Sequence, residues 1–276
     1  MPSRLTDAQR RQVDLWLGDW TLLGDHTWPL QDTTVLHVRS EGREYIVKAT
    51  ERSHHLAREL VAHREHLAGV ADVVPRLVHA SDELQVLVAT YLPGRLVAGD
   101  AAEFEHDTYR QAGRILARFL EPIGTSADYV PALVDKSLAQ VVDAAALADP
   151  AHLTAARAEL ERMPRLPVPL HFTHGDYQPR NWLVHEGIIR LIDFGRAAPR
   201  HWTSELVRMQ HQQFLVDPAL EVAFFEGLGR ELTDEDRAVL RLENLSQTLG
   251  TIVWAHGIGD TDYEQEGRVM LARLLA

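Results

Sequence analysis

Hydrophobic positions in the first third of the chain come in short runs separated by polar turns, which is typical of β-strands. A short helix is expected before them, because Thr6 and Gln9 have the spacing of a capping box and Gly18 supplies a stop. Residues 53–68 predict a second helix, ended by Gly69. Strands are expected over residues 20–23, 35–38, 44–49, 75–79 and 84–90, with a hairpin turn at residues 40–43.

After Gly94 the hydrophobic positions take on the spacing of amphipathic helices. One expected helix has a hydrophobic face made by Phe104, Ala112, Ile115, Leu116, Phe119 and Leu120. Further helices are expected between residues 131 and 163 and after residue 203, with short strands near residues 170–173, 182–184 and 188–192. The pattern predicts an α+β fold with two lobes: a small antiparallel sheet with one main helix over residues 1–90, and a larger, mostly helical lobe over residues 91–276. A hinge at about residues 89–95 would join them.

The composition is that of an ordinary globular protein. Of its 276 residues 45% are hydrophobic, enough to bury a large core. The 28 basic and 40 acidic residues give a net charge of −12, which repels nucleic acid and anionic membranes, so we expect neither as a partner. The N-terminal residues lack an apolar signal region, and no apolar run approaches the roughly 20 residues of a membrane-spanning helix. We therefore expect a cytoplasmic monomer or homodimer.

Two short segments carry the candidate chemistry: His174-Gly-Asp-Tyr-Gln-Pro-Arg-Asn181 and Ile192-Asp-Phe-Gly195. Phosphoryl transfer requires a base for the attacking hydroxyl and Mg²⁺ held against the phosphates. Asp176 can take the proton, and Asn181 and Asp193 offer the hard oxygen ligands that Mg²⁺ prefers. The strand–turn–strand between Asn181 and Asp193 has the right length to bring these two side chains together. We therefore predict Asp176, Asn181 and Asp193 as catalytic residues, the last two also as metal ligands.

The chain resembles the aminoglycoside phosphotransferase family and its relatives, the choline, fructosamine and macrolide kinases. The resemblance includes Tyr45-Ile-Val-Lys48, Val86-Leu-Val-Ala-Thr-Tyr-Leu-Pro-Gly94 and Gln111-Ala-Gly-Arg-Ile-Leu, and extends over about residues 20–210. It implies a protein-kinase-like fold with Mg²⁺ and ATP, or alternatively GTP, as cofactors. The activity implied is transfer of the γ-phosphoryl group to a hydroxyl of a small molecule.

The resemblance also implies roles for residues of the sheet lobe. Lys48 would contact the α- and β-phosphates and pair with a glutamate of the following helix. Glu59 and Glu65 are the two candidates for that partner. Leu56, Leu60, His63 and Leu67 define the buried face of this helix. Glu59 borders that face and Glu65 points away from it, so we choose Glu59.

The remaining nucleotide contacts are expected from a loop and from the hinge. The segment over residues 26–34 would cover the phosphates without any glycine, with Thr33 and Thr34 as possible ligands or as ordinary strand-start residues. The backbone of the hinge, at Thr90, Tyr91 and Leu92, would meet the purine. Tyr91 could equally be a packed aromatic residue.

Several features separate this chain from protein kinases. Only residues 196–202 lie between the second motif and the next helix, which leaves no room for an activation loop. Gln178 stands where protein kinases carry Lys. Glu205 stands where the family has an acidic residue that braces the catalytic loop, although it could simply be a helix N-terminal charge. His174 is expected to orient the loop. A small-molecule acceptor is therefore favoured over a peptide.

The acceptor is expected between the catalytic loop and the C-terminal helices. Residues 217–276 hold 12 acidic and 5 basic residues, so a cationic substrate could be bound there. The candidate acceptor contacts are Asp217, Glu221, Glu226 and Glu243, with Trp254 as a stacking wall, against the alternative of a solvated helix surface. The predicted function is resistance by phosphorylation of an aminoglycoside, macrolide or nucleoside antibiotic. The alternatives are a kinase of choline, another amino alcohol or a sugar, and a non-catalytic nucleotide-binding protein.

Overall fold

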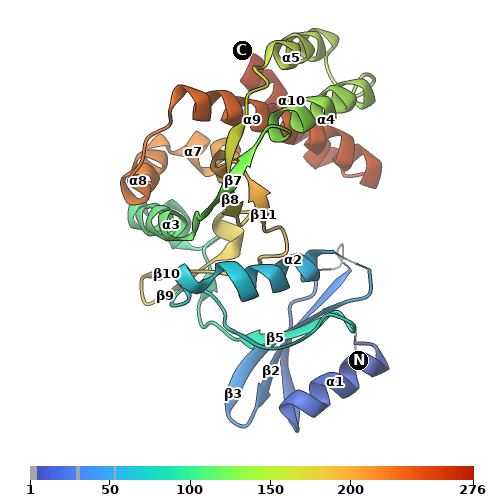
Figure 1. The fold of residues 1–276 in the computed structure, drawn as a ribbon, viewed down its shortest axis with the longest axis vertical. Helices are drawn as coiled ribbons and strands as arrows, with labels where there is room; N and C mark the ends of the chain where they lie inside the picture. The colour runs from blue at the N-terminus through green and yellow to red at the C-terminus, as the bar shows by residue number, and fades with distance from the viewer. Residues whose placement is uncertain (1–4, 29–31, 53) are drawn as a thin grey trace.

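The computed structural model describes residues 5–28, 32–52 and 54–276. Its N-terminal part is a five-stranded antiparallel sheet in the order β1-β2-β3-β5-β4, with one helix on each face (Figure 1). The helices are α1 (Asp7–Leu17) and α2 (His55–Val61), and α2 continues as a π-helical stretch (Ala62–His66). The strands are β1 (Trp20–Asp25), β2 (Thr33–Ser40), β3 (Arg43–Thr50), β4 (Leu77–Ser81) and β5 (Val86–Thr90). Ser53, the first residue of the expected second helix, lies outside the described residues.

Alternation along the strands decides what each face of this sheet presents. In β5, Val86 and Val88 join the core under α1, whereas Leu87 and Ala89 pack against α2. In β3, Val47 and Ala49 also face α1. Since successive side chains of a strand point to opposite faces, Lys48 must point toward α2. This alternation aims the lysine at the cleft described below.

The hairpin turn expected at residues 40–43 is present, and so is the turn of the strand–turn–strand expected between Asn181 and Asp193. Ser40 pairs with Arg43 across a turn in which Glu41 and Gly42 both have positive φ, at 49° and 75°. The turn at Glu186 and Gly187 repeats this geometry, with φ of 50° and 75°. Two consecutive positive φ values are the signature of a type I′ turn, whose twist matches that of the paired strands.

The rest of the chain is mainly helical, as expected. It also contains two small antiparallel sheets, in the orders β10-β9-β6 and β11-β8-β7. Their strands are β6 (Arg95–Leu96), β7 (Pro122–Ser126), β8 (Val168–Thr173), β9 (Trp182–His185), β10 (Ile188–Leu191) and β11 (Ala198–Arg200). The helices are α3 (His106–Phe119), α4 (Tyr129–Asp143), α5 (Pro150–Arg162), α6 (Val207–His211), α7 (Gln213–Val216), α8 (Pro218–Leu228), α9 (Asp234–Ile258) and α10 (Thr261–Leu275). The α+β prediction is confirmed.

The expected helix over residues 104–120 begins later than predicted. Phe104 lies in a short 3-10 turn ahead of α3 and is exposed, so its place on the buried face was wrong. The turn is capped by the side chain of Asp100, which accepts a hydrogen bond from the N–H of Ala102. This cap sets the turn apart from α3, which begins at His106.

Helices α3 and α8 cross with their backbones almost in contact. A Cβ added to Gly113 of α3 would overlap the carbonyl oxygen of Phe224, and one added to Gly227 of α8 would overlap the carbonyl oxygen of Arg110. Only glycine at both positions permits this approach. The crossing supports the catalytic loop, because the hydroxyl of Tyr177 donates a hydrogen bond of 2.7 Å to the carbonyl of Ala112.

None of the helices in the described part of the chain is both long enough and apolar enough to cross a membrane.

Candidate active site

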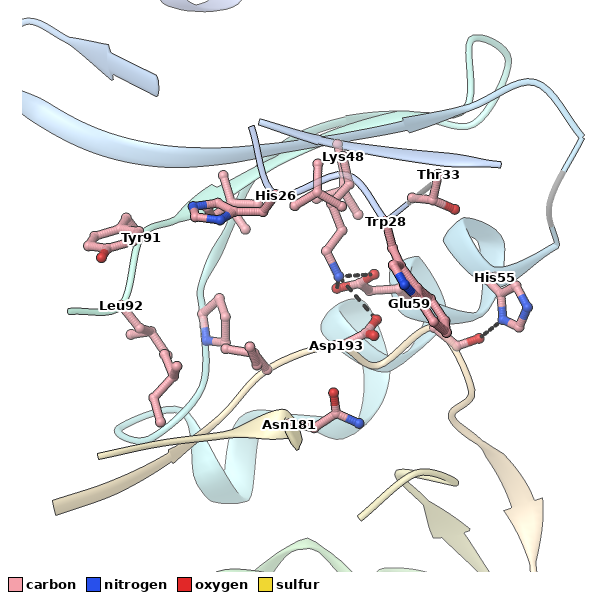
Figure 2. A pocket seen from close by; sticks show the side chains of 18 of the residues that line it. His26, Trp28, Thr33, Lys48, His55, Glu59, Tyr91, Leu92, Asn181 and Asp193 are labelled. Atoms are coloured by element: carbon pink, nitrogen blue, oxygen red, sulfur yellow. Dashed lines mark hydrogen bonds and ion pairs between the residues drawn. The ribbon is translucent and has the colours of Figure 1, made fainter. Parts of the chain in front are cut away.

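A cavity of about 760 Å³ lies between the five-stranded sheet and the helical part of the chain (Figure 2). It is lined from the sheet side by Lys48 and from the helical side by Asp176, Asn181 and Asp193. Tyr91 lies where the two parts join. The structure thus brings together, in one cleft, residues that are up to 145 positions apart in the chain.

The loop over residues 174–181 follows strand β8 and is fixed by its own backbone. Gly175 has a φ of 77°, and a Cβ at this position would overlap the carbonyl oxygen of Arg196. Strands β9 and β10 then fold back as a hairpin, and the N–H of Ile192 donates a hydrogen bond of 3.0 Å to the carbonyl of Asn181. This bond places Asp193, the next residue, beside Asn181.

Glu205 fixes the start of this loop through hydrogen bonds to its backbone. Its carboxylate is only 1% exposed and accepts hydrogen bonds from the backbone N–H groups of His174 and Gly175. Burial raises the pKa of Glu205 to about 7, against the opposing pull of Arg200 and of these two N–H donors. The bracing contact expected from the sequence is therefore present.

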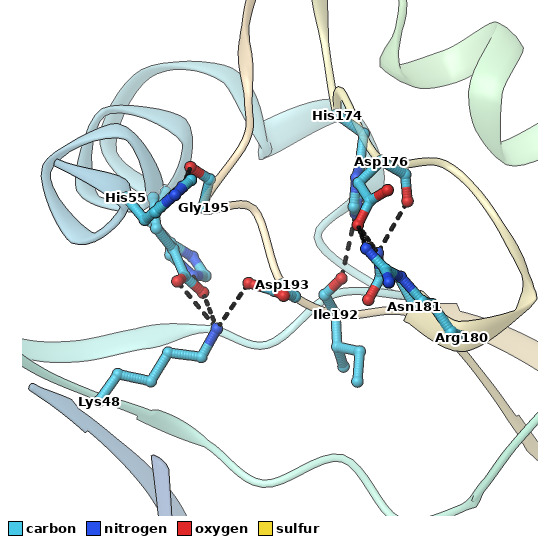
Figure 3. Close-up of polar contacts among 11 residues, drawn as sticks. Lys48, His55, His174, Asp176, Arg180, Asn181, Ile192, Asp193 and Gly195 are labelled. Atoms are coloured by element: carbon cyan, nitrogen blue, oxygen red, sulfur yellow. Dashed lines mark hydrogen bonds and ion pairs between the residues drawn. The ribbon is translucent and has the colours of Figure 1, made fainter. Parts of the chain in front are cut away.

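His174 ties the loop to the second motif. Its Nε2 donates a hydrogen bond of 3.1 Å to the carbonyl of Ile192 (Figure 3). Its ring packs against Phe194. Burial lowers the pKa of His174, so the ring is neutral and orients the backbone instead of carrying charge. This agrees with the orienting role expected from the sequence.

Asp176 is buried and surrounded by donors. Its carboxylate accepts hydrogen bonds from Gln178 at 2.5 Å, Arg180 at 2.5 Å and Asn181 at 3.0 Å. Burial by itself would raise the pKa of Asp176, but the charges of Arg180, Arg196 and Arg208 outweigh it and the pKa is lowered. The carboxylate is therefore ionised, as a proton acceptor must be.

Lys48 is held between two carboxylates (Figure 3). Its Nζ donates to both oxygens of Glu59, at 2.8 and 2.9 Å, and to Oδ1 of Asp193 at 3.2 Å. Burial opposes the charge of Lys48, but Asp193 and Glu59 outweigh burial and raise its pKa. The structure thus pairs Lys48 with Glu59, the chosen candidate, and not with Glu65.

Asp193 is placed to reach into the cleft. Its backbone is left-handed, with φ 66°, a conformation that Asp adopts more readily than most residues. Its side chain is 51% exposed, and Lys48 lowers its pKa to about 2. In Figure 2 the amide oxygen of Asn181 points toward Asp193. Two hard oxygen donors therefore face the same part of the cleft.

The residues expected to meet the nucleotide lie at different places. Thr33, Thr90, Tyr91 and Leu92 line the cleft, whereas Thr34, which is buried, is absent from the described lining. The N–H of Thr90 donates to Arg76 and that of Tyr91 to Glu44, and the Tyr91 ring stacks on His37 at 4.0 Å. Of the expected phosphate-covering loop, residues 29–31 lie outside the described part of the chain.

The acidic residues expected around the acceptor are engaged elsewhere. Among the described residues that line the cleft, none of the four appears. Asp217 caps α8, and Glu226 forms an ion pair with Arg110 at 2.8 Å. Glu221 lines a separate, smaller cavity, and Glu243 is buried, where it accepts a hydrogen bond from Tyr129. The structure does not bring these carboxylates to Asp176.

Trp254 is the expected acceptor residue that the structure links to the catalytic loop. It is 51% exposed, and its ring meets that of Tyr263 edge to face at 6.0 Å. The Tyr263 hydroxyl accepts a hydrogen bond of 3.0 Å from Arg208, whose Nε lies 3.8 Å from Asp176. Tyr263 of α10 is therefore linked to Asp176 through Arg208.

Sequence reasoning missed the arginines and one histidine. Arg180 lies within the first motif, and its spacing of four from Asp176 in a turn could have indicated the contact. Arg196 and Arg208 offered no local signal, since they approach Asp176 through tertiary structure. His55 was also missed: its Nδ1 donates a hydrogen bond of 2.7 Å to the carbonyl of Gly195 and ties α2 to the second motif.

A sequence model of the phosphotransferase enzyme family matches residues 30–242. Among solved structures, the chain is similar to aminoglycoside phosphotransferase APH(4)-Ia, with 16% identity, a TM-score of 0.66 and 98% of each chain covered. It is also similar to macrolide 2′-phosphotransferase MphH from Brachybacterium faecium, with 20% identity, a TM-score of 0.66, and 96% and 98% of the two chains covered. Spectinomycin phosphotransferase APH(9)-Ia, solved with ADP and spectinomycin, gives 12% identity, a TM-score of 0.68 and 99% of each chain. No curated protein matches the chain.

Proposed function

Because the chain belongs to the phosphotransferase enzyme family, we propose that it transfers the γ-phosphoryl group of ATP, or GTP, to a hydroxyl of an antibiotic. The observation that carries the proposal is the meeting of Asp176, Asn181, Asp193 and Lys48 in one cleft. Each of these side chains supplies a function that phosphoryl transfer requires. Use of a nucleotide triphosphate is consistent with the cytoplasmic location expected from the sequence.

The roles follow from charge and position. Lys48, fixed by Glu59, places a positive charge where the phosphates of the nucleotide would lie. Asp176 is ionised and accepts the proton of the acceptor hydroxyl, whose oxygen attacks the γ-phosphorus. The bond from that phosphorus to the β–γ bridging oxygen breaks, and the nucleoside diphosphate leaves. Positioning and charge do most of this work, since the transition state is loose.

Asp193 and Asn181 are the residues that fit Mg²⁺. Both offer the hard oxygen donors that Mg²⁺ prefers, and they face the same part of the cleft. Within the described residues, no three His, Cys, Asp or Glu side chains lie close enough together to hold a metal ion. Phosphate oxygens and water would therefore have to supply the other ligands. When bound, the ion would neutralise charge on the phosphates.

The hinge residues hold the base of the nucleotide in this proposal. The backbone donors of Thr90 and Tyr91 are used within the sheet, so the backbone of Leu92 is the one proposed to meet the purine. The nucleotide-binding lobe would then be residues 1–90 and the catalytic and acceptor-binding lobe residues 91–276.

An antibiotic acceptor is supported by the similar structures, which are aminoglycoside, macrolide and spectinomycin phosphotransferases. The test is a mass-spectrometric screen with ATP and Mg²⁺ for products heavier by one phosphoryl group. Antibiotics of these classes, amino alcohols and sugars are the candidate acceptors. The class of acceptor that is phosphorylated tells an antibiotic kinase from a metabolite kinase. Asp176→Ala should lower kcat for the best acceptor by about 10²–10⁴-fold, with ADP affinity little changed. Arg118→Ala, which removes an exposed ion pair far from the cleft, is the control. Near-full turnover by Asp176→Ala would refute the assignment of the base.

A further inference from the structure

Three arginines gather around the single carboxylate of Asp176. Arg180 contacts it at 2.5 Å and Arg208 approaches it at 3.8 Å, from the loop and from α6. Arg180 and Arg196 line the cleft beside it. Together the three guanidinium groups and one carboxylate leave an excess of two positive charges.

This gathering of positive charge is unfavourable without a further anion. Burial lowers the pKa of Arg196, the charges of Asp176 and Asp193 oppose burial, and the charges of Arg208 and Arg180 lower the pKa further, so it stays below its usual value. Like charges at close range repel strongly where water is excluded. The cluster is therefore suited to a ligand that brings negative charge with it.

The nucleotide phosphates account for only part of this cluster. Their proposed place is beside Lys48 and Asp193, and Arg180 and Arg196 line the same cleft. Arg208 is different, because it is not among the described residues that line this cleft. It approaches Oδ1 of Asp176, whereas Arg180 contacts Oδ2, and it donates a hydrogen bond to Tyr263 of α10.

Tyr263 and Trp254 extend this surface outward. Their rings meet edge to face, and Trp254 is half exposed. The Arg208 side chain is 20% exposed, and its guanidinium is held by the hydrogen bond to Tyr263. A guanidinium beside exposed aromatic rings, next to the base, is a surface for a ring-bearing acceptor with an oxyanion.

The carboxylates of the C-terminal helices do not counter this charge. Asp217 lies 3.6 Å from His106, and Glu226 is paired with Arg110. Glu243 is buried, and burial raises its pKa to about 8, which favours its protonated, uncharged form. The acidic excess of the sequence is thus placed away from Asp176 or neutralised.

We propose that the acceptor of this enzyme carries an oxyanion, a carboxylate or a phosphate monoester, close to the hydroxyl that is phosphorylated. Arg208 binds this oxyanion, with Arg180 turning from Asp176 toward it as the acceptor enters. The proton of the hydroxyl passes to Asp176, the oxygen–phosphorus bond forms and the bond to the nucleoside diphosphate breaks. The product carries the new phosphate on the acceptor hydroxyl, and its carboxylate or original phosphate is unchanged. Among antibiotics of the proposed function, the same charges favour an acceptor that bears an acid group over a polycationic aminoglycoside. This inference rests on the proposed phosphotransferase function.

The test is calorimetric binding to the full chain saturated with ADP and Mg²⁺. The probes share one sugar ring: glucose, glucosamine, glucuronate and glucose phosphate. The two anions should bind at least 10-fold more tightly than glucose and glucosamine, and the comparison between them tells a carboxylate site from a phosphate site. Arg208→Gln should reduce that preference by about 10–100-fold, the value of one hydrogen bond to a charged group. Arg208→Lys should keep part of it, because the charge remains but the forked donor geometry is lost.

Arg241→Gln is the matched control, since Arg241 is a partly buried arginine of the same helical part, paired with Glu159 at 2.6 Å. It should leave the preference unchanged. If ADP binds but neither anion binds more tightly than glucose, or if Arg208→Gln keeps the full preference, the oxyanion proposal is overturned while the phosphotransferase function stands. If ADP itself does not bind, both proposals fall.

Discussion

Replacing Lys48 with Met tests the electrostatics of the cleft most directly. The methionine keeps the length and most of the volume of the lysine stem but removes the charge that satisfies Glu59. The Glu59 side chain is 6% exposed and loses both hydrogen bonds from Nζ. Burial already raises the pKa of Glu59 above its usual 4.5, against the opposing effect of Lys48, and without Lys48 it rises further. The folded variant therefore holds Glu59 protonated.

The loss of stability in Lys48→Met cannot exceed the free energy needed to protonate Glu59, because protonation removes the unpaired buried charge. At pH 7, keeping a carboxyl protonated whose unfolded pKa is 4.5 costs about 3 kcal/mol, from 1.36 kcal/mol for each pH unit above that value. At pH 5 the same cost is below about 1 kcal/mol. Since the folded pKa is the higher one, the variant is most stable at low pH and loses stability as the pH rises. We expect Lys48→Met to be nearly as stable as the wild type at pH 5 and about 3 kcal/mol less stable at pH 7.

Urea unfolding at pH 5, 6, 7 and 8 measures this directly. The double variant Lys48→Met, Glu59→Gln should show little of the added pH dependence and should be more stable than the single variant at pH 8. Lys136→Met, on the exposed face of α4, should match the wild type throughout. A Lys48→Met variant destabilised equally at pH 5 and pH 8 would refute the reasoning, because the loss could then not come from the charge of Glu59.

Three further predictions follow from the same structure. Asp193→Ala should abolish the Mg²⁺-dependent part of nucleotide binding, measured as the difference in ADP affinity with Mg²⁺ and with EDTA; an unchanged difference would remove Asp193 from the metal site. Gly113→Ala should destabilise the fold by about 1–3 kcal/mol in urea unfolding, because its Cβ would overlap the backbone of α8, whereas Gly257→Ala, with open space around it, should not. Burial raises the pKa of Glu243 to about 8, so the contribution of Glu243 to stability should fall as the pH rises from about 4.5 to 8. Glu243→Gln removes this contribution, so the Tm difference between variant and wild type should change over that pH range; a constant difference would contradict it.

The sequence by itself determined much of the catalytic centre because the controlling interactions are local. The positions of Asp176, Asn181 and Asp193 follow from one loop and the hairpin after it, which is closed by Glu186 and Gly187. The alternation of side chains along β3 likewise aimed Lys48 at the helix that carries Glu59. Over such short separations, turn chemistry and strand period leave few alternatives.

Tertiary structure alone decided the rest. Strands β6, β7 and β11 are two to five residues long, and each exists because a distant strand pairs with it. The acidic residues of the last sixty positions suggested a binding site for a cationic acceptor. In the folded chain, however, several of them form ion pairs or helix caps, or are buried in the core. The arginines around Asp176 come from three separate segments, and no pattern along the chain sets the distances between them. Charge in a sequence can be counted, but the direction of its field depends on where the folded chain places each group.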